Sequence, residues 1–534
     1  MSVFTFMPRG ANGIIIRVEA DLRRGIPGVD ISGLAEGAVR EARERIRAAF
    51  RNSGFQFPLD RILINLAPAG LKKEGAALDL PIALSVMEAA KLTPVSGNLL
   101  VMGELELSGK IRPVRGVLAA IAAGLKEGIT EFIVPAENAG EAAILRSAGA
   151  KFIAVENLQN AVHALIIREE KGELPAPLEH QSILSDHSNN KSSIYISDGD
   201  FSDVRGQIIY KRALEIAAAG GHNVLVFGPP GAGKTMLARR LPSIMPPLSP
   251  DEAVEVTRLH SLAGYYQNNS GKTSNQFIDC LITTPPFRSP HHSASAEGIL
   301  GGGRTPHPGE ISLAHFGVLY LDEAPEYRIN VLQALREPLQ DKVISIARAD
   351  GIVQLPAEFQ LLLTANSCRC GRLGMRNSEV SCLCSQDEIN RYWRKFGGAL
   401  LDRVEIRTAV LPPKIEEMSQ NDPFSCETSA IIASRVKKAV KIQQYRFKGT
   451  GIRRNALITT DKISTFCSMN EKAEKAFFTA IEKLGFSGRA YYAVLRVART
   501  IADLEGKDTI EIEHILEAVH HRRLGEDPWD ILSV

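Results

Sequence analysis

Two periodicities of apolar residues divide the chain into regions. Residues 1–168 combine short apolar runs with stretches of helical periodicity, which predicts an α/β domain. Residues 169–200 are rich in Ser, Asn, Pro and Asp and lack periodicity, as is typical of a surface linker. The apolar runs of the first region include 14–18, 62–66 and 152–155, and its helical stretches include 36–52 and 80–90.

Residues 201–412 predict a second α/β domain. A helix over 211–219 precedes an apolar strand over 223–227, a glycine-rich loop and a helix over 235–241. This order favours a parallel sheet flanked by helices. Over 413–534 the strand patterns fade, so we expect an all-α lid domain. Its helical patterns cover 429–445, 470–484, 488–504 and 512–523.

The composition narrows the class of protein. A chain of 534 residues exceeds the usual domain length several times, and 44% apolar with 23% charged residues is ordinary for a soluble globular protein. It has no run of about 18 apolar residues, the length that crosses a bilayer. The first residues lack the pattern of a secretory signal, so we expect a cytoplasmic protein without a membrane partner. The net charge of +2 neither indicates nor excludes a nucleic-acid partner.

The glycine-rich loop carries the strongest chemical signal. Its sequence, GPPGAGKT, matches the phosphate-binding pattern GxxxxGK[ST] and has the strand before it and the helix after it that this pattern requires. Backbone N–H groups of such a loop converge on phosphates. We expect Lys234 to neutralise the β- and γ-phosphates of ATP and Thr235 to bind Mg²⁺, the alternative being a glycine-rich turn with a surface lysine. The loop comprises Gly228, Pro229, Pro230, Gly231, Ala232, Gly233, Lys234 and Thr235.

Two further apolar runs end in polar residues. The run 318–321 predicts a buried strand that brings Asp322 and Glu323 to the sheet edge where ligands bind. We expect Asp322 to bind Mg²⁺ and Glu323 to orient or deprotonate the attacking water. The run 360–366 ends in Asn366, whose amide can contact the γ-phosphate or this water. The alternatives are a surface acidic pair and an asparagine that only starts a turn.

Three stretches of the sequence together resemble the YifB/ComM family of magnesium-chelatase-like AAA+ ATPases. They are GPPGAGKTMLARRLP at 228–242, FRSPHHSASAEGILGGGRTPHPGEISLAHFGVLYLDEAPE at 287–326, and SGRAYYAVLRVARTIADLEG at 487–506. The likeness extends over nearly the whole chain, including the N-terminal region. It implies an AAA+ core followed by a helical lid.

The resemblance also implies an ATP site that is shared between the subunits of a ring, in the form of a hexamer. It makes Asn366 sensor 1, Arg403 the arginine finger offered to the neighbouring subunit, and Arg489 sensor 2. A finger from the neighbour stabilises the charge on the γ-phosphate only when the ring assembles. Spacing alone does not distinguish either arginine from a surface or salt-bridged residue.

A long polar insert precedes the strand that ends at Asp322. About residues 261–310 are polar, glycine-rich and locally basic, and in similar AAA+ proteins such an insert forms a hairpin that projects toward the pore. Positive charge and flexible turns suit a loop that grips a nucleic-acid strand. The alternatives are a solvated loop and a metal site, although the histidines match no zinc spacing. The basic residues are Arg288, His291, His292, Arg304 and His307.

Four cysteines lie within residues 368–384, as two CxC pairs. Four thiolates this close in sequence can bind one tetrahedral ion, although the CxC spacing is tighter than usual. The sequence therefore predicts a structural zinc site, with a reduced and metal-free loop as the alternative. The residues are Cys368, Cys370, Cys382 and Cys384.

The N-terminal region resembles the Lon-protease-like, S5-like fold, in which a Ser–Lys dyad cleaves peptides. Ala77, within KKEGAALD at 72–79, stands where the nucleophilic serine would be expected. Because alanine cannot form an acyl-enzyme, we expect a non-proteolytic platform. The helix predicted over 36–52 carries arginines at helical spacing, which suit either phosphate contacts or an ordinary solvated face. They are Arg40, Arg43, Arg47 and Arg51.

The residues and the resemblance together favour a ring-forming AAA+ ATPase that uses ATP and Mg²⁺ to translocate on single-stranded or branched DNA. The family likeness implies helicase and branch-migration activity in natural transformation and homologous recombination. One alternative is a magnesium-chelatase-type motor that remodels a protein partner for metal insertion, a class expected to lack the N-terminal domain. A Lon-type protease or unfoldase is another, against which Ala77 argues. The DNA partner rests on the resemblance, because no base-reading module is visible in the sequence.

Overall fold

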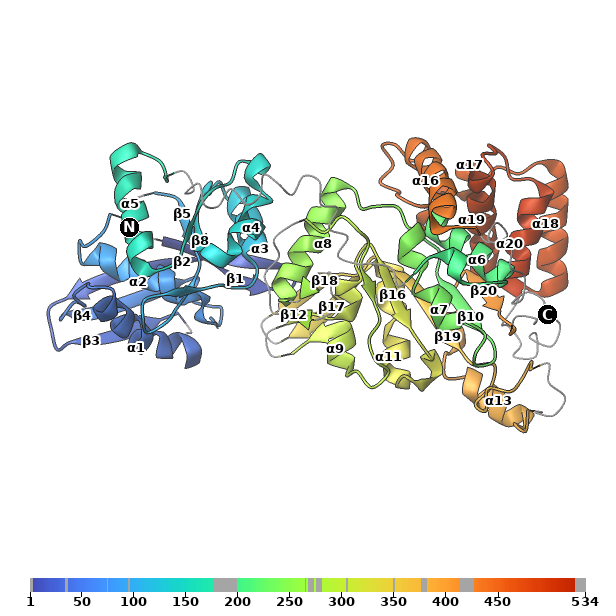
Figure 1. Cartoon of the computed structure of the whole chain (residues 1–534), viewed down its shortest axis with the longest axis horizontal. Coiled ribbons are helices and arrows are strands. Elements are labelled where there is room, and N and C mark those ends of the chain that lie inside the picture. Colours follow the sequence, from blue (N-terminus) through green and yellow to red (C-terminus); the bar gives the residue numbers. More distant parts are fainter. Residues whose placement is uncertain are drawn as a thin grey trace.

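The computed structural model has three regions arranged along one long axis (Figure 1). An N-terminal α/β region lies at one end, a central α/β region follows, and a cluster of helices from the C-terminal part lies at the other end. The structure describes residues 3–33, 37–73, 75–94, 97–175, 199–264, 266–267, 273–274, 281–303, 306–348, 351–375, 382–412 and 427–523.

A seven-stranded mixed sheet forms the base of the N-terminal region, in the order β3-β4-β2-β1-β5-β8-β9. Strands β1, β2 and β4 pair antiparallel, and the remaining strands join in parallel at the two edges. In β2 the buried Ile16 and Val18 lie two positions apart, as a strand with one face in a core requires. The bounds are β1 Val3–Arg9, β2 Asn12–Arg23, β3 Gly28–Ser32, β4 Arg61–Ala67, β5 Leu99–Val101, β8 Glu131–Pro135 and β9 Lys151–Val155.

Helices pack against both faces of this sheet. One apolar core includes residues of α1, α2 and α5, and the other includes residues of α3 and α4. A small hairpin of β6 (Glu104–Leu105) and β7 (Ile111–Arg112) lies beside them. The helices are α1 Gly37–Asn52, α2 Asp79–Ala89, α3 Val117–Lys126, α4 Ala139–Ala143 and α5 Leu158–Lys171.

The central region is built on a parallel sheet of five strands, in the order β13-β16-β19-β10-β20. Its strands β10, β16, β19 and β20 are buried along their whole length, because helices cover both faces. Their continuous apolar runs explain why the sequence predicted β10, β16 and β19. The bounds are β10 Val224–Phe227, β13 Phe287–Arg288, β16 Val318–Leu321, β19 Gln360–Ala365 and β20 Ile406–Ala409.

Short helices and hairpins complete the central region. Three two-stranded hairpins pair β11 with β12, β14 with β15, and β17 with β18. The hairpin strands are β11 Tyr266–Gln267, β12 Thr273–Ser274, β14 Gly301–Gly302, β15 His307–Pro308, β17 Val343–Arg348 and β18 Gly351–Pro356. The helices are α6 Ile208–Gly220, α7 Lys234–Ala238, α8 Pro250–Ala263, α9 Ala296–Leu300, α10 Glu310–Leu313, α11 Ile329–Ala334, α12 Arg336–Asp341, α13 Gln386–Trp393 and α14 Gly398–Leu401.

The polar segment over 261–310 is a narrower insert than its composition indicated. Ser261 lies inside α8, and Phe287 and Arg288 form the edge strand of the central sheet. Elsewhere in this segment the described residues include the pairs β11–β12 and β14–β15 and the helix α9. Polar composition could not show that both ends of this segment belong to packed elements, and the expected projection toward a pore stays a prediction.

The C-terminal region is helical over the described residues 427–523, apart from short connections. Its helices α16 and α19 share one apolar core with α6 and β10 of the central region. Gln443 donates from Nε2 to the carbonyl of Ala219 at 3.1 Å, and His222 lies 2.8 Å from the Thr500 hydroxyl. The helices are α16 Ser429–Arg446, α17 Ile463–Phe466, α18 Glu471–Leu484, α19 Gly488–Leu504 and α20 Ile512–Arg523.

Helix α8 joins the N-terminal and central regions (Figure 1). Leu262 of α8 packs into the apolar core formed by α3. The Ser261 hydroxyl donates to the buried carboxylate of Glu141, which also accepts from the backbone N–H of Leu118 at 2.7 Å. Burial raises the pKa of Glu141. The two regions are therefore joined by apolar packing and by a buried polar contact.

No helix in the part of the chain that the structure describes is long and apolar enough to cross a membrane.

Candidate nucleotide-binding site

The glycine-rich loop follows the C-terminal end of β10 and leads into α7. Gly228 packs closely against the backbone just after β20. A Cβ added to Gly228 would approach the Val410 carbonyl oxygen to 2.0 Å. Gly231 and Gly233 have φ values of 77° and 83°, which side chains rarely adopt. These glycines let the backbone turn tightly and aim its N–H groups inward, as a phosphate-binding loop requires.

Lys234 lies across the mouth of this loop. Its ammonium group donates to the carbonyl oxygens of Gly228 at 2.7 Å and Pro229 at 2.8 Å, and to Oδ1 of Asn366 at 3.2 Å. Asn366 comes directly after β19, the strand beside β10, so two adjacent strand ends deliver the pair. Burial lowers the pKa of Lys234 to about 8, although Asp322 and Glu323 act in the opposite direction.

The side chains of Thr235 and Asp322 are in contact next to Lys234. The Thr235 hydroxyl is 3.1 Å from Oδ2 and 3.3 Å from Oδ1 of Asp322, which follows β16. A hydroxyl and a carboxylate at this distance supply the hard oxygen ligands that Mg²⁺ takes alongside substrate phosphates. The residues present therefore fit a magnesium ion.

Thr364 of β19 forms hydrogen bonds with both Asp322 and Glu323. The sequence did not identify this residue. Its hydroxyl donates to Oδ1 of Asp322 at 2.5 Å and accepts from the backbone N–H of Glu323 at 3.1 Å. Glu323 has a φ of 48°, a left-handed conformation that costs about 1–2 kcal/mol in a residue other than glycine. The Thr364 contact helps to hold Glu323 in this conformation, with its side chain exposed beside the loop.

Two residues before the loop also position it, and sequence reasoning missed both. Gln207, with a φ of 56°, donates from Nε2 to the carbonyl oxygens of Ala232 at 3.0 Å and Leu411 at 2.7 Å. The Tyr210 hydroxyl donates to the carbonyl of Lys234 at 3.1 Å. Gln207 directly precedes helix α6, and Tyr210 lies within it. The apolar periodicity of this helix predicts which residues are buried, but it does not predict hydrogen bonds to the loop.

Arg403 lies at the edge of the central sheet where the strands begin, whereas the glycine-rich loop lies at the edge where they end. It precedes β20, which runs parallel to β10, and its carbonyl accepts from Nδ2 of Asn223 just before β10 begins. A strand of this length spans roughly 13 Å, so Arg403 is separated from its own loop by the depth of the sheet. Its guanidinium donates to Ala399 and Gln340.

Arg489 lies beside Arg403 and away from Lys234. Both arginines line a cavity of about 560 Å³ between the central sheet and the C-terminal helices. Burial, followed by the charges of Arg489 and Arg336, lowers the pKa of Arg403. The structure thus gathers three guanidinium groups at this edge, of which Arg336 was not identified from the sequence. Such a group has the charge to contact an anion brought by another molecule.

The remaining candidates lie outside this loop. The four cysteines come together, with all their sulfurs within 4.8 Å of one another. Among the described residues no metal-ligand group contains the histidines of the insert, and Arg304 lies outside the described residues. On α1 the side chains of Arg43 and Arg51 are exposed, Arg47 lies over the Phe57 ring at 5.3 Å, and the Arg40 side chain is outside the description. Ala77 is the middle residue of a single-turn 3-10 helix, Ala76–Leu78, and is partly buried.

Three family models match the chain along its length. The model "Magnesium chelatase, subunit ChlI" matches residues 200–418, and "Magnesium chelatase, subunit ChlI C-terminal" matches 426–522. The model "Subunit ChlI of Mg-chelatase" matches 18–138.

Relatives match over almost the entire chain. The Competence protein ComM of Haemophilus influenzae is 38% identical over 527 residues, which covers 98% of this chain and 97% of the relative. The Uncharacterized protein YifB of Escherichia coli is 37% identical with the same coverage. A Mycobacterium tuberculosis protein is 37% identical over 98% of both chains. The chain belongs to the YifB/ComM family of magnesium-chelatase-like AAA+ ATPases.

Two matches concern the two alternative functions, a Lon-type protease and a magnesium-chelatase-type motor. A Lon protease of Salinispora arenicola is 24% identical over 174 residues, which is 31% of this YifB/ComM chain and 22% of the protease. The magnesium-chelatase model over 18–138 covers much of the N-terminal region. The presence of that region therefore does not separate the chain from chelatase motors, contrary to the expectation from the sequence.

Proposed function

We propose that this YifB/ComM chain is a ring-forming ATPase in which each ATP site is completed by the neighbouring subunit. One observation carries the proposal: the loop, Asp322 and Asn366 meet at one edge of the central sheet, whereas Arg403 and Arg489 lie at the other. In the proposed ring, the edge that bears Arg403 and Arg489 in one subunit faces the edge that bears the glycine-rich loop in the next subunit. The arginines then contact a phosphate that their own subunit does not hold.

The residues at the loop have separate roles in this proposal. Lys234 leaves its carbonyl partners and neutralises the β- and γ-phosphates, and Thr235 and Asp322 would hold Mg²⁺. The ion, when bound, supplies positive charge beside the phosphate oxygens. Glu323 accepts a proton from the attacking water, and Asn366 orients that water or the γ-phosphate. Arg403 and Arg489 stabilise the charge that develops on the transferred group.

We further propose that the ring is a hexamer that moves single-stranded or branched DNA in the cytoplasm, as a helicase and branch-migration motor. The support is the 38% identity to the Competence protein ComM over 98% of the chain. A competence protein acts where incoming DNA is taken up, so natural transformation and homologous recombination are the proposed processes. The Ala77 position supports a non-proteolytic platform for the N-terminal region.

A magnesium-chelatase-type motor is the second candidate. The descriptions of all three family models favour it. In that case the same ATP site would drive remodelling of a protein partner for metal insertion, and DNA would not change the rate of hydrolysis.

The proposal is tested by the rate of ATP hydrolysis of the full chain alone, with single-stranded DNA and with a branched junction. We expect several-fold stimulation by one of the DNAs, because strand binding in the pore orders the sites between subunits. Glu323→Gln is the control, since it keeps the side-chain shape and should bind ATP without turnover. Normal nucleotide binding and hydrolysis without stimulation by any DNA would refute the DNA motor and leave the chelatase-type motor.

A further inference from the structure

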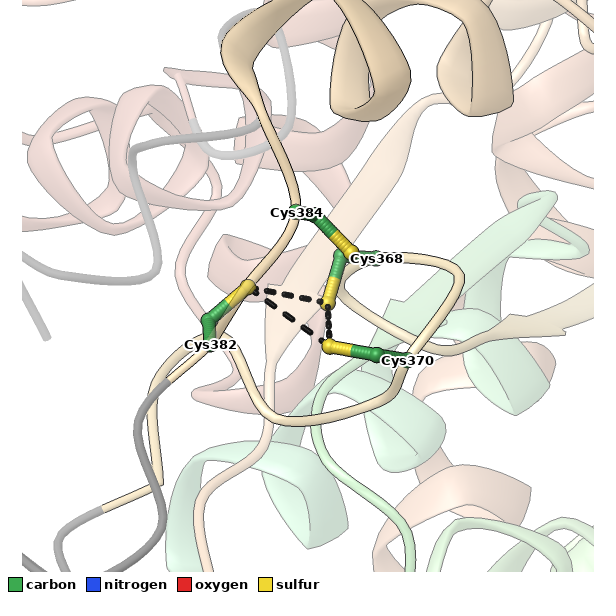
Figure 2. Close-up of side chains that lie close together, drawn as sticks. All are labelled: Cys368, Cys370, Cys382 and Cys384. Atoms are coloured by element: carbon green, nitrogen blue, oxygen red, sulfur yellow. Dashed lines mark hydrogen bonds between the residues drawn. The ribbon is translucent and has the colours of Figure 1, made fainter.

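The four cysteines form a compact cluster, with their side chains pointing toward one another (Figure 2). Cys368 and Cys370 lie in the turn after β19, and Cys382 and Cys384 lie in the segment that enters α13. The sulfur of Cys368 is 3.3 Å from that of Cys370 and 3.6 Å from that of Cys382, and Cys370 and Cys382 are 3.6 Å apart. Each cysteine is free of a disulfide.

These distances match a tetrahedral ion. Four sulfurs at about 2.3 Å from a central Zn²⁺ lie about 3.8 Å from one another. The three separations of 3.3, 3.6 and 3.6 Å and the common limit of 4.8 Å bracket that value. Thiolates are soft ligands that select Zn²⁺ over Mg²⁺, and four of them close the coordination shell without an open position for substrate. The geometry is that of a structural site.

We propose that these four thiolates bind one Zn²⁺, and that the ion clamps the turn carrying Asn366 against the phosphate-binding loop. The positioning part rests on the proposed ATPase function, whereas the metal site stands on the sulfur geometry. The site thereby acts through Asn366 and Trp393 rather than through contact with substrate.

The turn after β19 links the cluster to Asn366. The strand ends at Ala365, and Asn366 and Ser367 are the residues between it and Cys368. The Ser367 carbonyl accepts from Nε1 of Trp393 at 3.0 Å, and Cys368 is fully buried. Asn366 lies only two residues before Cys368. A shift of the Cys368 sulfur would therefore also displace the Asn366 side-chain amide.

The same turn also touches the phosphate-binding loop. Gly371 lies against Pro230, and a Cβ added to Gly371 would approach Cδ of Pro230 to 2.9 Å. The Trp393 ring packs edge-on against Phe227, the last residue of β10, with 5.2 Å between ring centroids. The turn and Trp393 thus contact the first part of the glycine-rich loop and the strand residue that precedes it.

The second CxC pair anchors the start of α13. Cys384 directly precedes Ser385, whose side chain and Glu388 form a capping box at the first turn of the helix. Helix α13 carries Trp393 and continues through α14 to Arg403. An ion shared by the two pairs would therefore fix the segment that bears the proposed finger relative to the segment that bears Asn366.

Metal analysis of the full chain, purified under reducing conditions without chelator, tests the site directly. We expect one zinc per chain in the wild type and none in a Cys370→Ser/Cys382→Ser variant. Cys467→Ser is the matched control, because Cys467 is buried in the C-terminal helices and should leave the zinc in place. A wild type that holds no zinc and takes none up on reconstitution, or one in which these cysteines are disulfide-bonded, would overturn the site.

Tryptophan fluorescence tests the clamp without relying on ATP hydrolysis. In a Trp529→Phe background, Trp393 is the sole tryptophan of the chain. Removing zinc should shift its emission to longer wavelength, because the contact with Ser367 loosens and water reaches the ring. An unchanged spectrum in a folded, zinc-free sample would overturn the clamp and leave the metal site standing.

Hydrolysis adds a second readout of the clamp. The folded double variant should show kcat on the order of tenfold lower or more, with a smaller change in KM for ATP, because a displaced Asn366 acts on the transition state. Wild-type kcat in the zinc-free variant would also overturn the clamp. If the zinc-loaded wild type hydrolyses no ATP, the proposed function fails while the metal and fluorescence results still stand.

Discussion

At the scale of single residues, Lys234 combines burial with a charge that the proposed function needs. Its pKa is lowered to about 8 by burial. Below that pH the free protein carries the ammonium group that binds phosphate. As the pH rises through about 8 the proton is lost, and ATP binding must then take up a proton. We expect ATP affinity to be constant up to pH 7 and to fall by up to about tenfold per unit above the pKa.

Titration with a fluorescent ATP analogue between pH 6.5 and 9.5 measures this effect, over a range of about three units around the lowered pKa. Lys234→Arg is the control, because a guanidinium stays protonated across the range and should remove the pH dependence even if its affinity is lower. If the wild-type Kd were the same at pH 6.5 and pH 9.5, this would contradict the lowered pKa of Lys234.

Thr364 gives a second prediction at this scale. Thr364→Val keeps the shape of the side chain but removes the hydroxyl that joins Asp322 to the Glu323 backbone. We expect kcat to fall about tenfold or more with little change in ATP affinity, because Glu323 loses its support. Thr364→Ser should stay near the wild-type rate. Steady-state hydrolysis together with ATP binding checks this, and a wild-type kcat for Thr364→Val would show that Glu323 needs no such support.

Residues that belong to a motif were predictable from the sequence, and residues that support the motif were not. GPPGAGKT and Asp322 follow strand patterns that have few alternative meanings. The roles assigned to the loop residues and to Asp322 stay predictions. The same holds for Glu323, Asn366, Arg403 and Arg489. Thr364, Gln207 and Arg336 act through contacts that only the folded chain brings about, so spacing could not find them.

At the scale of elements, α8 is the connection between two regions of the molecule. Ser261→Ala removes the hydroxyl that reaches the buried Glu141 across this junction. We expect the contact between α3 and α8 to weaken by about 1–3 kcal/mol, because a buried carboxylate loses a partner. Hydrogen exchange should become faster in both helices.

Ser108→Ala is the matched control for this junction, because Ser108 is an exposed serine of the N-terminal region that bonds only locally to Glu106 and Lys110. It should leave the exchange of α3 and α8 as in the wild type. Identical exchange in Ser261→Ala and wild type would mean that apolar packing around Leu262 alone holds the junction.

Elements with a strong period were predictable, and short paired elements were not. The apolar run 318–321 and the helical pattern 488–504 match β16 and α19 in the structure. The β17–β18 hairpin was missed, because its six-residue strands are partly exposed and lack the continuous apolar run that marks β10, β16 and β19. The edge strand β13 has two residues, which is too short for any period to show.

At the scale of the whole molecule, the mixed α/β class with a parallel sheet was predictable, and the family relationship is confirmed by relatives that match 98% of the chain. The arrangement of the two sheet edges was not predictable. Asn223 and Arg403 are far apart in sequence, and only the pairing of β10 with β20 shows that Arg403 lies opposite the loop. This opposition is the basis for the proposal of an ATP site shared between subunits.

Mixing two inactive variants tests that shared site most directly. Lys234→Ala lacks the phosphate lysine but keeps Arg403, and Arg403→Ala has the reverse defect and should still bind ATP. Each alone should hydrolyse ATP slowly, whereas an equal mixture that exchanges subunits should recover up to about a quarter of the wild-type rate, the share of random interfaces with both groups intact. A mixture no faster than the sum of its parts, or Arg403→Ala at the wild-type rate, would contradict a site completed by the neighbouring subunit.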